Sequence, residues 1–299
     1  VWTTPIKKKK WGIGFDFNIS RNENIIREIS EFYPSSKGDA TQLGNYIRLL
    51  QVDNPFGSFY GYRYKGVYKD RAATIAQSNT GKQIIGPNGQ IVYMRFNYPN
   101  IDYVFQPGDA IYEDINNDGN INYMDIVYLG NSNPKLSGGF GPSFTWKDKL
   151  KVSTFFNFRY GYNIVNGTKL TTTNMYYFDN QSTATLRRWR KEGDVTDIPR
   201  AVIAGGYNWL GSDRYVEDAS FVRFRSLTVR YTFDSKALSK YKMKNISAYI
   251  TGENLFTLSK YTGQDPEVSA SGADPFRIAY DYSMTPPARI FTIGLVAGF

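Results

Sequence analysis

One short stretch of the sequence has the residue types and the spacing of a calcium-binding loop. It reads DINNDGNINYMD and runs from Asp114 to Asp125. Counted from its first residue, side-chain oxygens stand at positions 1, 3, 5, 9 and 12 and a glycine at position 6, which is the spacing with which hard oxygen donors wrap around one ion. The predicted ligands are Asp114, Asn116, Asp118, Asn120 through its backbone carbonyl, Asn122 and Asp125. Ile121, at position 8, is predicted to point inward and anchor the loop.

This loop departs from the usual pattern at position 12, where Asp125 replaces glutamate. A shorter carboxylate reaches less easily for bidentate binding of the metal. The flanking residues lack a helical pattern, so we predict a loop and not a helix–loop–helix unit. An Asx-rich turn can also keep its shape through hydrogen bonds from the backbone to its side chains, with no ion bound. We therefore predict a structural calcium site, with an ion-free turn as the alternative.

Several kinds of chemistry are excluded by composition. The chain of 299 residues contains no histidine and no cysteine. Disulfides, thiolate or histidine-ligated metal sites, Ser-His-Asp triads and Cys-His pairs therefore cannot form within it. Paired carboxylates remain available for catalysis. No apolar run approaches the ~18 residues of a transmembrane helix, and no signal peptide is visible, so Val1 need not be the natural start.

Alternation of apolar and polar residues is the main structural signal, because a period of two gives a strand with one face of each kind. Aromatic residues make up 16% of the chain, which suits sheets and membrane-interface belts. We predict about seven strands. They are Trp11–Ser20, Ser58–Lys69, Leu136–Trp146, Leu150–Tyr160, Ser220–Phe233, Ile246–Thr251 and Ile290–Phe299, and a short helix is predicted at Asn24–Ile29.

The connections between the predicted strands alternate in length. Residues 147–149 form a tight turn and residues 234–245 a modest one, whereas 161–219 and 255–288 are long. Compact soluble domains seldom tolerate such long loops, but transmembrane barrels have short turns on one side and long loops on the other. We predict an all-β fold, an antiparallel transmembrane β-barrel segment with long extracellular loops. A soluble sandwich with its polar face in water is the alternative.

The formal net charge is +9. The basic residues gather at 7–10 and at 187–191, within expected loops, and form no stripe along one element. Nucleic acid is one possible partner of such charge. We favour solvated loops or contact with an anionic membrane surface, and predict no nucleic-acid partner.

A series of segments, in this order, resembles the SusC/RagA family of TonB-dependent outer-membrane transporters. They are Pro55–Tyr68, Pro107–Asp125, Gly130–Gly141, Trp189–Arg200, Ser212–Phe233, Tyr249–Val268 and the terminal strand ending in Phe299. Within them, Asn254, Tyr261, Gly263, Asp265, Pro266 and Glu267 match the family's NLF…YxGxDPE signature. We interpret the signature as loop architecture, with Asp265 and Glu267 as carboxylates of a turn and a network.

The resemblance implies that residues 1–299 are the C-terminal part of one barrel domain, of about 22 strands with a plug in its lumen. The plug and the N-terminal strands would then lie outside this chain. About seven strands cannot close, and an open edge in lipid leaves unpaired backbone groups that cost several kcal/mol each. Phe299 would be the aromatic C-terminal residue that resembles the recognition signal for barrel assembly.

The implied function is import and not catalysis, so no catalytic residue is predicted. By this resemblance, the protein takes up oligosaccharides or oligopeptides through the bacterial outer membrane. A SusD/RagB-like surface lipoprotein would cover it as a lid, and TonB would supply the energy. Aromatic and polar side chains in long outer loops suit such nutrients. The candidate substrate residues are Tyr176, Tyr177, Asp179, Asn180, Tyr207, Asn208 and Trp209, with packing of the loop or contact with the lid as the alternative.

Two other functions compete with import. One is a secreted, calcium-stabilised β-sheet module that binds or hydrolyses glycans, and the other is a structural surface-layer barrel. A soluble module would bury the apolar face of Leu227, Val229, Tyr231 and Phe233, whereas a barrel would present that face to lipid. The location of these side chains separates the first rival from import.

Overall fold

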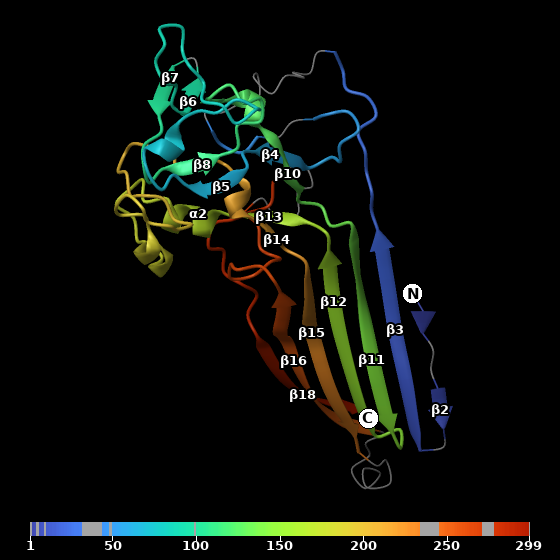
Figure 1. The fold of residues 1–299 in the computed structure, drawn as a ribbon. Helices are drawn as coiled ribbons and strands as arrows, with labels where there is room; N and C mark the ends of the chain where they lie inside the picture. Colours follow the sequence, from blue (N-terminus) through green and yellow to red (C-terminus); the bar gives the residue numbers. More distant parts are fainter. Residues whose placement is uncertain are drawn as a thin grey trace.

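The computed structural model describes residues 2–3, 6–8, 10–31, 44–47, 50–98, 100–233, 245–270 and 278–298. Figure 1 shows long strands lying side by side, with shorter elements gathered beyond one end of them. We call the long sheet the wall. The described residues of the segments that connect its strands at that end (within 22–135, 161–220 and 260–289) form the outer region. Among the described residues, no helix has the length and apolar character to cross a membrane.

The wall is an antiparallel sheet in which the strands lie in the order β1-β3-β11-β12-β15-β16-β18, and β2 also pairs with β3. Its strands are β1 (Trp2–Thr3), β2 (Ile6–Lys8), β3 (Trp11–Arg21), β11 (Leu136–Trp146), β12 (Leu150–Tyr160), β15 (Phe221–Thr232), β16 (Asn245–Ser259) and β18 (Ile290–Gly298). Six of the predicted strands are therefore confirmed as wall strands, about as long as predicted or longer.

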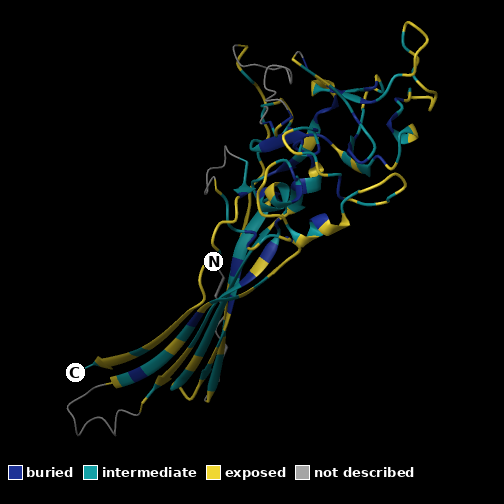
Figure 2. Cartoon of the chain, turned by 90° about the vertical axis from the view of Figure 1, so that its left-hand side faces the viewer, coloured by how far each residue is buried: buried dark blue, intermediate teal, exposed yellow. Residues whose placement is uncertain are grey.

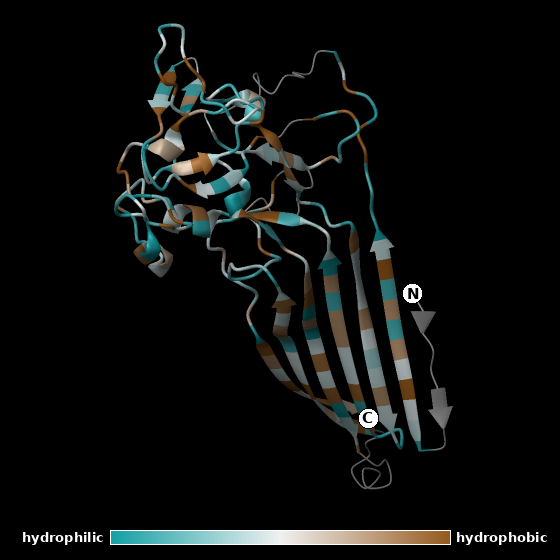
Figure 3. Cartoon of the chain, in the orientation of Figure 1, coloured by the Kyte–Doolittle hydropathy of each residue, from teal (hydrophilic) through white to brown (hydrophobic). Residues whose placement is uncertain are grey.

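Residues that pair across neighbouring strands of the wall have similar polarity. One row, on β12, β15, β16 and β18, is apolar: Val152, Val229, Ile250 and Ile293. The adjacent row is hydroxylic: Ser153, Thr228, Thr251 and Thr292. Figure 3 shows the resulting bands of opposite hydropathy along the strands. The wall therefore has one apolar and one polar face, as the alternation predicts.

The apolar face is exposed and not buried in a protein core. Val229 is 38% exposed, Ile250 55% and Ile293 81%. Figure 2 shows the wall mostly intermediate or exposed along its length. This is the arrangement expected of a barrel segment and not of a soluble sandwich, in which one face of the sheet would be covered.

A β-bulge keeps the apolar face continuous towards the outer region. The register between β15 and its two neighbours shifts at Arg225, so Phe224 pairs with Phe156 on one side and with Phe256 on the other. The rings of Phe156 and Phe224 stack with centroids 4.4 Å apart, and Phe140 stacks on Phe156 at 4.9 Å. The extra residue changes which residues face each way, as a bulge does.

The ends of the wall differ as predicted. The tight turn between β11 and β12 is confirmed: Lys147 and Asp148 both have φ of 53°, and the Lys149 amide donates to the carbonyl of Trp146. The predicted turn at 234–245 lies outside the described residues except for its last residue, as does Phe299. The β3–β11, β12–β15 and β16–β18 connections all run through the outer region (Figure 1).

The outer region is built from small sheets and single helical turns. Its strands are β4 (Ser58–Gly61), β5 (Tyr64–Val67), β6 (Arg95–Tyr98), β7 (Ile101–Val104), β8 (Ala110–Tyr112), β9 (Asn120–Ile121), β10 (Val127–Asn131), β13 (Asn163–Asn166), β14 (Val216–Asp218) and β17 (Tyr280–Asp281). Its helices are η1 (Ala72–Thr74), η2 (Tyr123–Asp125), α2 (Gly167–Thr173), η3 (Thr183–Arg187) and η4 (Asp213–Tyr215). Strands β4 and β10 pair, β5 and β8 pair, β6 lies between β7 and β9, and β13 lies between β14 and β17.

Nearly all buried apolar side chains of the described residues belong to the outer region (Figure 2). The largest cluster contains Tyr62, Phe96, Phe105, Ile121 and Leu210, each fully buried. The core is rich in tyrosine, and the phenols find polar partners: Tyr62 and Tyr98 share a hydrogen bond of 2.6 Å. The outer region thus packs like a water-soluble domain, whereas the wall does not.

Two of our sequence predictions are wrong. Ser58–Lys69 is not one wall strand but the two short strands β4 and β5, and β4 is buried along its whole length. Asn24–Ile29 is not a helix: the segment is irregular, and Ile26 exchanges backbone hydrogen bonds with Asp53 and Asn54. In both cases pairing with a distant segment overrides the local pattern.

Candidate functional site

The loop at 114–125 is held by its own carboxylates. Asp114 accepts hydrogen bonds from the backbone amides of Asp118 and Gly119, the latter at 2.7 Å. Asp118 accepts one from Asn120 at 2.7 Å. Gly119 has a φ of 83°, which favours glycine, and a Cβ there would lie 2.9 Å from the Ala76 Cβ. Ile121 is fully buried, which confirms its predicted inward position.

Asp125 closes the loop. Its side chain is fully buried, and its two carboxylate oxygens accept hydrogen bonds from the amides of Ile115 and Asn122, each at 2.8 Å. Burial raises the pKa of Asp125 to about 6, and the nearby carboxylates of Asp114 and Asp118 add to the rise although the two hydrogen bonds oppose it. The predicted acidic ligands are therefore close enough to interact electrostatically.

These contacts are those of an Asx-rich turn, and a calcium site remains a prediction. Among the described residues, no three His, Cys, Asp or Glu side chains are grouped as a metal would need. Asn116 donates its amide to Asp118 Oδ2, and Asn122 accepts from the Met124 amide. The donor set consists of hard oxygens, and an oxygen that accepts one hydrogen bond keeps a second lone pair. The residues present therefore fit a hard cation by chemistry.

The two aromatic groups predicted as substrate residues come together on the surface of the outer region. Tyr176 contacts Tyr177 edge-to-face with centroids 4.7 Å apart, and it contacts Trp209 at 6.0 Å. Tyr207 lies 6.2 Å from Trp209. Tyr177 is 63% exposed. The side chains of Asp179 and Asn180 are also exposed, next to this group.

Asn208 is the exception among the predicted substrate residues. Its side chain is buried, its amide oxygen accepts a hydrogen bond from the Ala110 amide at 2.8 Å, and its amide nitrogen contacts Asp109 and the Arg200 carbonyl. Asp109 is itself fully buried and pairs with Arg200 at 2.7 Å. Asn208 thus supports the loop from within.

The signature residues after β16 serve architecture, as predicted. Arg223 on the wall is 1% exposed and donates two hydrogen bonds, at 2.6 and 2.7 Å, to the Asp265 carboxylate. Glu267 lies beside Arg159 at 3.3 Å and Arg223 at 3.6 Å. The Tyr162 hydroxyl donates to the carbonyl of Pro266. This network ties the outer region to the wall.

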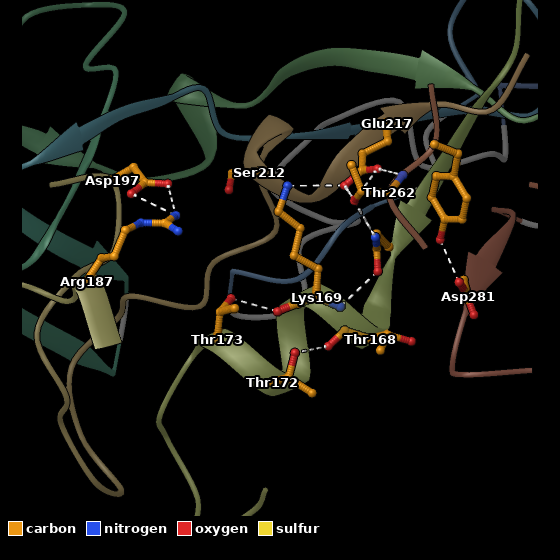
Figure 4. Close-up of polar contacts among 12 residues, drawn as sticks. Thr168, Lys169, Thr172, Thr173, Arg187, Asp197, Ser212, Glu217, Thr262 and Asp281 are labelled. Atoms are coloured by element: carbon orange, nitrogen blue, oxygen red, sulfur yellow. Dashed lines mark hydrogen bonds and ion pairs between the residues drawn. The ribbon is translucent and has the colours of Figure 1, made fainter. Parts of the chain in front are cut away.

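Sequence analysis missed a pocket of about 500 Å³ in the outer region. Helix α2, η3, η4, the start of β5 and the loop after β16 all contribute to it, so no single motif indicates it. Its charged lining residues are Lys169, Arg187, Asp197 and Arg214. Figure 4 shows Lys169 extended towards Glu217 and Arg187 paired with Asp197.

Glu217 organises one side of that pocket. It accepts hydrogen bonds from the Thr262 amide and hydroxyl, both at 2.8 Å, and pairs with Lys169 at 3.1 Å (Figure 4). Burial alone would raise the pKa of Glu217, but these bonds outweigh it and hold the pKa below its usual value. The carboxylate therefore stays charged and joins β14, α2 and the loop after β16.

The chain is similar to several curated receptors. It is 27% identical over 292 residues to "TonB-dependent receptor P3" of Formosa agariphila, covering 93% of this chain and 26% of that protein. It is 25% identical to "TonB-dependent receptor SusC" of Bacteroides thetaiotaomicron, covering 99% of this chain and 25% of that protein. No family model matches. The chain is therefore similar to TonB-dependent receptors, SusC among them, along nearly its whole length. It spans about a quarter of the length of the curated relatives it matches.

Solved structures of this type share the fold. The RagAB peptide transporter superposes with a TM-score of 0.67 at 17% identity, covering 98% of this chain and 28% of that one. Its "closed-closed" state gives 0.64 at 18% identity. The SusC/RagA-type wall is accordingly a segment of an antiparallel transmembrane β-barrel in the outer membrane, and the relatives carry the names of receptors and transporters, not of enzymes.

Proposed function

We propose that this chain is the C-terminal part of a plugged barrel of about 22 strands that imports a large nutrient across the outer membrane. The observation that carries the proposal is the two-faced wall. Its exposed apolar rows suit lipid, and its rows of serine, threonine and asparagine suit a wet interior. Among the described residues, β18 pairs only with β16, so the rest of the barrel would continue the sheet from it.

The proposed partners are a SusD/RagB-like surface lipoprotein, TonB and outer-membrane lipid. The structural neighbour is described as RagAB, a peptide transporter. In this chain, Phe178 is 89% and Tyr177 63% exposed on the outer region, more than solvated loops need. Such rings suit contact with a lid protein or with the nutrient. Coupling to TonB would pass through a region outside residues 1–299.

The proposed substrate is an oligosaccharide or an oligopeptide. Tyr176 and Tyr177 would offer ring faces, and Asp179 and Asn180 would offer polar groups. Tyr207 and Trp209 pack against the core of the outer region and would contribute only the part of each ring that stays exposed. Asn208 would act indirectly, by holding Asp109 and Arg200 in place. We also propose that calcium binds the loop at 114–125 and fixes its shape, since the loop supplies hard oxygen donors and its acids Asp114 and Asp118 help to raise the pKa of Asp125.

Deletion of the gene, with growth measured on defined nutrient mixtures, tests import. We expect the deletion strain to lose uptake of one class, either labelled oligopeptides or labelled oligosaccharides, and to recover it when the full-length gene returns. A strain carrying Tyr177→Ala with Trp209→Ala should show weakened uptake, while Tyr128→Ala, in an exposed site on β10, should not. Unchanged uptake of both classes after deletion would contradict the proposal.

A further inference from the structure

Arg214 is the one guanidinium that lines the pocket without a carboxylate partner within the described part of the chain. Both of its terminal nitrogens are buried and lack a hydrogen-bond partner there. Its charge is met by two aromatic rings, with the guanidinium carbon 4.9 Å from the Tyr64 centroid and 5.2 Å from that of Tyr215. Cation–π contact offsets only part of the cost of burying an unpaired charge.

The nearby acids are already committed. Asp213 accepts a hydrogen bond from the Tyr64 amide at 2.7 Å, Glu217 pairs with Lys169, and Asp197 pairs with Arg187. Ser212, two residues before Arg214, is fully buried, and its hydroxyl has no partner among the described residues either. Arg214, which lines the pocket, is therefore the unsatisfied cation there, and an anion would satisfy it.

The rest of the pocket also suits an anionic group. Lys169 and Arg187 add two further cations, both partly exposed at 40% and 64% of their side chains. Hydroxyls of Thr168, Thr172 and Thr262 line the walls. The volume of about 500 Å³ lies in the range of pockets that hold small ligands. The threonine hydroxyls bond to other protein groups, so the cations make the lining basic, and its size suits one acidic sugar or a short peptide end.

We propose that this pocket is a subsite for a carboxylate group of the imported nutrient, with Arg214 as its principal ligand. The proposal rests on the proposed import function and deepens it, because it adds acidity as a requirement on the nutrient. A guanidinium binds a carboxylate through two parallel N–H donors, and both terminal nitrogens of Arg214 lack protein partners within the described residues. Because both nitrogens are covered, binding requires the Arg214 side chain to turn towards the pocket that it lines. Lys169 and Arg187, which line the same pocket, attract the anion.

Calorimetric titration of the full-length receptor in detergent tests the subsite with two matched pairs of probes. D-galacturonate is compared with D-galactose, and the dipeptide Ala-Ala with its C-terminal amide. We expect the acid of one pair to bind at least about tenfold more tightly than its neutral analogue, which corresponds to one charged contact. The pair that shows the preference identifies the source of the carboxylate. Equal binding within both pairs would overturn the proposal.

Variants assign the effect to the pocket. Arg214→Gln should abolish the preference for the acid, whereas Arg95→Gln, which removes a cation paired with Asp102 elsewhere in the outer region, should keep it. If the Arg214→Gln receptor does not assemble, Arg187→Gln takes its place. A reduced preference for the acid probe that weakens faster with added salt supports the proposal. An unaltered preference with an unaltered salt dependence contradicts it. If the receptor imports the nutrient but binds acid and neutral probes equally, the subsite alone is wrong. If it prefers the acid probe but imports neither class of nutrient, the import function alone is wrong.

Discussion

The wall and the outer region place their apolar side chains in opposite surroundings. In the wall, Ile293 and Leu295 are 81% and 69% exposed, although they belong to a regular strand that pairs with β16 along its length. In the outer region, Phe96 on the short strand β6 and Phe105 in the loop after β7 are both fully buried. The difference shows that the apolar side chains of the wall are covered by lipid hydrocarbon. The outer region is surrounded by water and therefore buries its apolar side chains in a core of its own.

The junction between the two regions should show the largest effect. Arg223→Ala removes the wall's half of a buried ion pair and leaves Asp265 uncompensated. We expect a loss of about 3–5 kcal/mol, seen as a lower midpoint of heat-induced unfolding of the full-length receptor on gels. Arg159→Ala is the matched control, since its pair with Glu267 is half exposed and should contribute about 0–1 kcal/mol. Equal midpoints for both variants would contradict the buried junction.

A charge on either face of the wall should distinguish lipid from lumen. Ile250→Arg places a guanidinium on the exposed apolar row, and we expect it to cost about 2–4 kcal/mol at mid-depth. Thr251→Arg, on the adjacent residue and the opposite face, should cost far less because it faces water. The same heat-unfolding measurement compares them. A costlier Thr251→Arg would reverse the assignment of the faces.

The loop at 114–125 should show an effect in metal content. Asp114→Asn with Asp118→Asn should abolish calcium retained by the full-length receptor, as measured by elemental analysis after gel filtration. Asp102→Asn, an exposed acid elsewhere in the outer region, should leave it unchanged. Calcium at the level of the unmodified receptor in the double variant, or none in the unmodified receptor, would exclude the proposed site.

The pH dependence of the same loop separates its two interpretations. The pKa of Asp125 is raised from 3.8 to about 6 by burial and neighbouring acids. The folded loop therefore binds more protons than the unfolded one between those values, so an ion-free loop gains stability as pH falls through 6 and loses it as pH rises. Calcium retention should instead fall with the same decrease in pH, because protons compete with the metal. Retention that is independent of pH across this range would argue against Asp125 as a ligand.

The smallest effect is expected at the turn between β11 and β12. Asp148 has a φ of 53°, a conformation that glycine adopts without steric cost. Asp148→Gly should therefore stabilise the receptor by about 0.5–1 kcal/mol, as a slightly higher heat-unfolding midpoint. Asp148→Val should lower the midpoint, since a β-branched residue is strained there. A lower midpoint for the glycine variant would show that the aspartate side chain matters more than the backbone.

The wall could be predicted from sequence because its signal is local. Alternation within Leu150–Tyr160 or Ile290–Gly298 determines which residues share a face. Contact of the apolar face with lipid stabilises that arrangement without any tertiary contact. The outer region gave no such signal. The alternation in Ser58–Lys69 suggests one strand, yet β4 and β5 pair with different partners some 43 to 73 residues away. Only tertiary contacts decide between these outcomes.

The candidate site was predictable only where its functional residues lie close together in the sequence. The spacing from Asp114 to Asp125 identified a loop whose acids do lie together. The aromatic residues 176–177 and 207–209 were found as separate groups, and the fold joins them. The pocket around Arg214 was missed because its cations come from positions 169, 187 and 214, and their proximity depends on the packing of α2, η3 and η4.

Spin-label accessibility of single cysteines tests the two-faced wall most directly, since this chain contains no cysteine of its own. The full-length receptor would be reconstituted in lipid vesicles with a label at Ile293→Cys or Thr292→Cys, adjacent positions on β18. We predict that the label at 293 collides mainly with oxygen, which concentrates in hydrocarbon, and that the label at 292 collides mainly with a water-soluble nickel chelate. Access of the nickel chelate to position 293 equal to its access to 292 would contradict a lipid-facing apolar row.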